Sequence, residues 1–109
     1  MRTPTTLKEC FTELSHILPP SGVEEFKTTS EDTATALAHH GIGQWMRNKW
    51  GLWSDSVLAK HLQEMGLTHA DDMSGLILTC YHRHLNDKPF EIEAQVQYYK
   101  DYWKEKAKV

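Results

Sequence analysis

The sequence predicts an all-α fold, a compact single-domain bundle of about five or six helices that spans residues 1–109. Apolar residues recur at intervals of three and four along most of the chain, and no strand-like alternation is longer than four residues. Glycine and proline interrupt this period at the points where helices are expected to end. A chain of 109 residues has the common size of one domain with one hydrophobic core.

Residues that begin and end helices give the expected boundaries. Serine and threonine cap a helix by accepting a backbone N–H of its first turn, while proline and glycine commonly follow its last turn. The expected caps are Thr3, Ser30, Ser54 and Thr68. The helices are expected at about residues 4–18, 31–40, 45–49, 55–65, 69–85 and 90–106, with a short helical turn at 23–26.

Two of these helices carry the clearest apolar faces. The helix at 69–85 is predicted to be central, because Leu76, Ile77 and Leu78 leave little polar surface at its middle. The last helix is expected to close the bundle with one apolar seam, which consists of Ile92, Val96, Tyr99 and Trp103.

Composition and charge exclude several classes of protein. The chain is 39% hydrophobic and 25% charged, as in soluble globular proteins, and no apolar run approaches the ~20 residues that a membrane span needs. The first residues lack the apolar segment of a secretory signal, so we expect a cytoplasmic protein without a membrane partner. A net charge of -3 argues against nucleic acid as the partner, because phosphate binding requires a basic surface.

Cysteine and histidine do not indicate a metal or redox site. Cys10 and Cys80 each lie in an apolar stripe and are interpreted as packing residues. His82 and His84 are two residues apart, a spacing that places them on different faces of a helix. We therefore expect no metal and no cofactor.

Three of the four tryptophans fall within residues 45–53, around the pair Arg47-Asn48. Arginine among indoles has two interpretations, because its fixed donors suit either an internal bridge or an anionic or planar ligand. In the first, Arg47 pairs with Asp71 or Asp72 and ties the tryptophan segment to the central helix. In the second, these segments line a binding site, whose candidate residues are Arg47, Asn48, Trp50, Trp53, Asp71, Asp72 and Ser74.

Catalysis has weaker support in the sequence. Asp71 and Asp72 are paired carboxylates suited to acid–base chemistry, but acidic residues at the start of a helix are also favoured by its dipole. Neither a nucleophile turn nor a glycine-rich phosphate loop is present. We assign no catalytic residue and do not expect an enzyme.

A resemblance rests on three segments: Gly43-Gln44-Trp45-Met46-Arg47-Asn48-Lys49-Trp50-Gly51-Leu52-Trp53, Asp71-Asp72-Met73-Ser74 and Tyr81-His82-Arg83-His84-Leu85-Asn86. In these segments the chain resembles a family of small bacterial and phage-encoded domains of unknown function. The resemblance spans about residues 18–103. The resemblance implies no activity or substrate. It does imply that the first two segments together form one structural feature.

These observations predict a binding domain that engages a protein partner through a face rich in tryptophan and arginine. Tryptophan, tyrosine and arginine are common interface anchors, and the negative net charge would speed encounter with a basic partner. The alternative is a pocket in which Arg47 and an indole hold a small anionic or planar ligand. Self-association into a homo-oligomer is a further alternative.

Overall fold

The computed structural model describes residues 3–107, which form helices and connecting turns without a strand in that range. The seven helices are α1 (Leu7–Ile17), α2 (Pro20–Thr28), α3 (Glu31–His39), α4 (Ile42–Lys49), α5 (Val57–Met65), α6 (Ala70–Leu85) and α7 (Ile92–Ala107). The predicted all-α class is confirmed. The predicted number of five or six helices is wrong, because the turn expected at 23–26 is a full helix.

The additional helix, α2, begins at Pro20. The sequence predicted that the first helix would end before this point, but it predicted only a short helical turn after it. Pro19 has an extended backbone at the N-cap, and Pro20 occupies the first helical position. Proline is well tolerated there, because the first-turn N–H that it lacks would have no partner within the helix. The Pro19-Pro20 pair therefore ends α1 and begins α2 with almost no linker.

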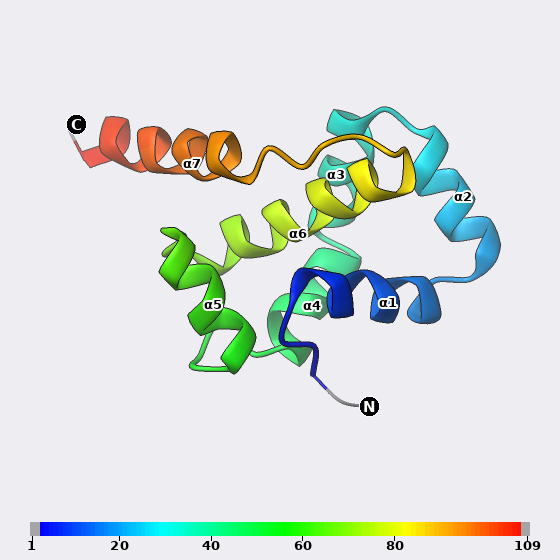
Figure 1. Ribbon diagram of the computed structural model, residues 1–109, viewed down its shortest axis with the longest axis horizontal. Coiled ribbons are helices and arrows are strands. Elements are labelled where there is room, and N and C mark those ends of the chain that lie inside the picture. The colour runs from blue at the N-terminus through cyan, green and yellow to red at the C-terminus, as the bar shows by residue number, and fades with distance from the viewer. Residues whose placement is uncertain (1–2, 108–109) are drawn as a thin grey trace.

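Helix α6 is the axis of the molecule, as predicted. In Figure 1 it runs through the middle of the structure, and each of the other six helices contacts it. Leu76, Ile77 and Leu78 are all buried. The apolar middle of α6 therefore contributes the largest continuous part of the core.

Helix α7 is packed on one side only. It lies along the N-terminal half of α6 and extends beyond it (Figure 1). Val96 is its one buried side chain, while Tyr99 and Trp103 on the predicted seam are partly buried. Gly75 permits this approach, because a Cβ at that position would lie 2.6 Å from the Tyr99 hydroxyl. The seam is confirmed, but most of α7 remains exposed.

Two helices are capped by a different residue from the one predicted. The Thr6 hydroxyl, not Thr3, caps α1 by accepting the Glu9 N–H at 3.1 Å. The Ser56 hydroxyl caps α5 by accepting the Ala59 N–H at 3.1 Å. In both cases a polar residue nearer the first helical turn is the cap.

The other expected caps make no capping hydrogen bond. The Ser54 hydroxyl donates to the carbonyl of Gly51 at 3.2 Å, within the turn before α5. The Thr68 hydroxyl lies 2.9 Å from Nδ1 of His69, so the predicted capping box with Asp71 does not form. Ser30 does occupy the N-cap position of α3, but its side chain makes no capping bond.

Both cysteines are completely buried in the core, as predicted for packing residues. Burial raises the pKa of the Cys10 thiol to about 12 and that of Cys80 to about 11. Thiolate is the reactive form, so neither side chain is nucleophilic near neutral pH.

We expect a disulfide reagent at about pH 8 to label the folded protein at least a hundredfold more slowly than the urea-unfolded protein, because the thiolate fraction falls tenfold per pKa unit. The measurement is the absorbance of the released thiol. Rapid labelling of one cysteine under folding conditions would contradict the packing assignment.

Candidate functional site

Arg47 joins three helices from the inner face of α4. It is only 4% exposed. Its Nη1 donates to the Ser74 hydroxyl on α6 at 2.8 Å, and its Nη2 donates to the His39 carbonyl at the end of α3 at 2.9 Å. The last carbonyls of a helix have no partner within it and carry partial negative charge. A buried guanidinium is therefore well placed to satisfy the C-terminal end of α3.

The same guanidinium meets the start of α6. Nε of Arg47 lies 3.3 Å from Oδ1 of Asp71, close enough for an ion pair although the angles are not those of a hydrogen bond. The Ser74 hydroxyl donates in turn to the Asp71 carbonyl at 3.0 Å. The predicted link between the tryptophan segment and the twin-aspartate segment is confirmed, with Asp71 as the partner.

Asp72 faces a different helix. Its carboxylate accepts the indole N–H of Trp103 on α7 at 2.7 Å, and the residue is buried. The Trp103 ring also stacks on His69, with 3.6 Å between ring centroids. Neighbouring positions on a helix point about 100° apart, so the two aspartates attach α6 to two different helices. The alternative in which Arg47 pairs with Asp72 is wrong.

The two tryptophans of the candidate site point in opposite directions. Trp50 is 2% exposed and lies in the hydrophobic core, where its ring is perpendicular to that of Trp45. Trp53 is 64% exposed. The reversal takes place across Gly51, which has a φ of +65°, and Leu52, which is buried. Glycine adopts a left-handed φ without the strain that a side chain would add, so Gly51 allows the chain to turn here.

The exposed indole is fixed in place by its neighbours. Trp53 donates its Nε1–H to the Asn48 side-chain oxygen at 3.2 Å. The hydroxyls of Ser54 and Ser56 both donate to the Gly51 carbonyl at 3.2 Å. Trp53 is thus presented to solvent by a turn with its own hydrogen bonds.

The seven candidate binding residues therefore separate into two sets. Four are buried within the protein: Arg47, Trp50, Asp72 and Ser74. Three are exposed at the surface: Asn48, Trp53 and Asp71. In the buried set, the polar atoms of Arg47, Asp72 and Ser74 bind neighbouring helices, and the Trp50 indole N–H lies in the core without a partner. Only the exposed set can touch a partner without rearrangement of the core.

Two residues of the Arg47 network were not anticipated from the sequence. His39 supplies its carbonyl, and its Nδ1 lies 3.5 Å from Nη1 of Arg47. Gly43, one turn before Arg47, would place a Cβ only 3.2 Å from that same nitrogen and 3.0 Å from the Ala38 carbonyl. The sequence offered one signal for this network. A glycine four positions before an arginine on the same helix leaves room for a buried guanidinium.

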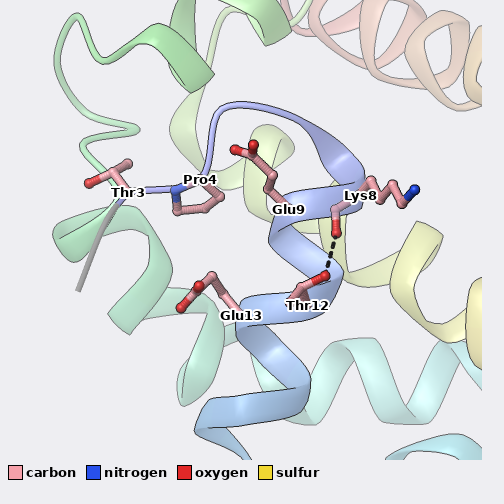
Figure 2. Close-up of a pocket in the computed structure, with 6 residues that line it drawn as sticks. All are labelled: Thr3, Pro4, Lys8, Glu9, Thr12 and Glu13. Carbon is pink, nitrogen blue, oxygen red and sulfur yellow. Dashed lines mark hydrogen bonds between the residues drawn. The ribbon is translucent and has the colours of Figure 1, made fainter.

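An open groove of about 300 Å³ lies at the N-terminal end of the described chain (Figure 2). It is formed by Thr3, Pro4 and one side of α1. The Glu9 carboxylate beside it accepts hydrogen bonds from the N–H and the hydroxyl of Thr5, at 2.7 and 2.9 Å. Lys8 points to the other side of the helix from Glu13 (Figure 2). The charged groups that line the groove do not converge on one point, so we assign this groove no role.

Metal and membrane sites find no support in the described chain. Within residues 3–107, no three His, Cys, Asp or Glu side chains are grouped so as to hold a metal ion. In the same range, no helix combines the length and the apolar character needed to cross a bilayer.

Comparison with known proteins identifies the family. A family model described as a domain of unknown function, DUF6794, matches residues 3–85. The chain belongs to this family. No curated protein and no solved structure is significantly similar to the chain.

The DUF6794 match relates directly to the fold. It covers α1 to α6 and contains all seven candidate residues, and it ends at the last residue of α6. Helix α7 lies outside it, so the partner of Asp72, Trp103, is supplied by a segment beyond the matched region. The resemblance was expected to span residues 18–103. The matched region begins earlier, at residue 3, and also ends earlier, at residue 85.

Proposed function

We propose that this DUF6794 domain binds a protein partner through a surface centred on Trp53. The surface also includes Asn48, which accepts the Trp53 N–H, and Val57, four residues further along the chain. The observation that carries the proposal is the exposure of the Trp53 indole, which leaves 64% of the residue accessible. Tryptophan is the residue most strongly enriched among the energetic centres of protein interfaces. Asn48 and Val57 are exposed as well.

The setting of Trp53 supports a binding role because the indole is ordered before a partner arrives. The Asn48 hydrogen bond and the Gly51 turn fix its position, so binding costs less side-chain entropy. Trp50 and Leu52 anchor the same turn in the core. The buried Arg47 network then acts as the support that holds α4, and with it this turn, against α6.

The alternative, a small anionic or planar ligand, has less support. It required Arg47 to be accessible beside an exposed indole, whereas all three guanidinium nitrogens face the protein. Acid–base catalysis by Asp71 or Asp72 is likewise less favoured, since each carboxylate is engaged by another helix. A protein partner, or a second copy of this chain, needs none of these groups to be released. A cytoplasmic location stays a prediction.

The test is a change of Trp53 to alanine. Partners are captured from the organism that encodes the chain with the wild-type domain, and the dissociation constant of each purified partner is then measured. We expect W53A to weaken binding at least about thirtyfold, as for an interface centre, because the indole is the largest apolar group on this surface. The same variant in sedimentation velocity tests self-association.

Tyr102→Ala is the matched control, since Tyr102 is an exposed aromatic residue on α7. It should change affinity by less than about twofold. A partner that binds W53A and the wild type equally well would refute the Trp53 surface. Both variants should have wild-type circular dichroism, which excludes unfolding as the cause.

A further inference from the structure

A second surface, separate from Trp53, lies where α3, α6 and α7 meet. It is a groove of about 420 Å³. Helix α3 contributes Glu31 and Asp32, α6 contributes Arg83, the turn before α7 contributes Glu91, and α7 contributes Tyr98. This groove does not depend on the proposed function, because it shares no residue with the Trp53 surface.

The charge of the groove is negative, although an arginine lies within it. Arg83 binds Glu31 through two hydrogen bonds, Nε to Oε1 at 2.7 Å and Nη2 to Oε2 at 3.2 Å. Its Nη1 donates to the Phe90 carbonyl at 2.6 Å. The pair holds the pKa of Glu31 below its usual range, so the two charges neutralise one another. The guanidinium is thus fully used within the protein.

Two further carboxylates give the rim its negative charge. Asp32 is exposed and makes no ion pair with any described residue. Glu91 is also exposed, and it forms only a long ion pair, 4.0 Å from its Oε2 to Nη1 of Arg83, whose charge Glu31 already neutralises. Anionic partners such as nucleic acid would be repelled by these groups. The charge of the groove complements a cationic group instead.

An aromatic face lies beside these carboxylates. Tyr98 is 67% exposed, although the neighbouring Tyr99, whose ring is inclined by 77° to it, is partly buried. A cation over the face of a tyrosine ring is attracted by the ring quadrupole. Guanidinium is suited to this combination, because it is planar, stacks on rings and binds carboxylates through paired N–H groups.

The geometry points to this groove as a docking surface for an arginine-bearing basic segment of a partner protein, with the guanidinium between Asp32 and Glu91 and against the ring of Tyr98. Ammonium groups fit it less well, because lysine carries a compact, strongly hydrated charge that does not stack. The surface adds a charged element of recognition to a domain whose other candidate contact, Trp53, is apolar.

The test uses the full chain labelled with ¹⁵N and a blocked peptide, acetyl-Gly-Arg-Gly-Arg-Gly-amide. We expect the amide signals of residues 31–32 and 91–99 to shift most on titration. Replacing both arginines by citrulline, which keeps the shape but removes the charge, should abolish the shifts. The lysine version should bind at least about threefold more weakly.

Matched variants of the protein then test the carboxylates. The double variant D32N/E91Q should weaken binding of the arginine peptide at least about fivefold. The control D55N/E64Q removes the same charge from exposed positions outside the groove and should change affinity by less than about twofold. Since all four residues are exposed, neither variant should unfold the protein.

A second pair of variants tests the ring. Tyr98→Leu should reduce affinity at least about threefold, while Tyr102→Leu should not. Equal weakening by the two double variants would show general charge attraction and overturn the proposal. Equal binding of the lysine or citrulline peptide would overturn it too, as would shifts that lie away from the groove. None of these outcomes involves Trp53, so the two proposals fail separately.

Discussion

Replacing Arg47 by leucine is expected to lower the free energy of unfolding by about 3 kcal/mol. The change removes two hydrogen bonds from a charged, buried donor, each worth roughly 1.5 kcal/mol or more. It also removes the donor of the partly buried His39 carbonyl at the end of α3. Urea denaturation followed by far-ultraviolet circular dichroism measures the effect.

Two control variants separate the contributions of this network. Arg47→Lys keeps the charge but loses the forked geometry, so it should recover less than half of the lost stability. Asp71→Asn should cost less than about 1 kcal/mol, because the Asp71 side chain is 56% exposed and water screens its attraction to Arg47. If R47L unfolds at nearly the wild-type urea concentration, Arg47 does not hold the three helices together.

Replacing Trp50 by alanine is expected to cost about 4 kcal/mol, the usual range for a buried aromatic residue. The indole fills the core beside Trp45 and Met46, so its removal leaves a large cavity. Trp53→Ala, three residues away, should cost less than about 0.5 kcal/mol, because that side chain is mostly exposed. Chemical denaturation of the two variants under identical conditions gives the comparison.

Should W50A fail to fold, Trp50→Phe provides a milder change. The Trp50 N–H is buried without a hydrogen-bond partner, so phenylalanine removes an unsatisfied donor together with part of the ring. A cost clearly below that of W50A is expected. Similar stabilities for W50A and W53A would contradict the opposite orientations of the two indoles.

The sequence predicted those parts of the fold that depend on helical period. The all-α class, the central place of α6 and the seam of α7 follow from apolar spacing, which the structure confirms. The caps were harder to predict, because neighbouring polar residues compete for the same first-turn N–H. Ser54 loses this role to Ser56, and Thr68 bonds a histidine side chain instead.

The candidate site was predicted as a set of neighbours but not as a surface. The pairing of Arg47 with an aspartate could be inferred, because a buried guanidinium requires an acceptor. The directions of Trp50 and Trp53 could not be inferred from their spacing of three, which is typical of one helix face. The left-handed turn at Gly51 breaks the helix between them, and only the tertiary structure shows which indole enters the core.

The weak attachment of α7 determines which part of the protein unfolds first. Only Val96 is buried on this helix, and Asp72 must lose its hydration before Trp103 can cover it. When α7 lifts away, the carboxylate regains water, which offsets part of the lost apolar contact. Opening of the last helix should therefore need much less free energy than melting of α6, and the first six helices should outlast it as heat or denaturant increases.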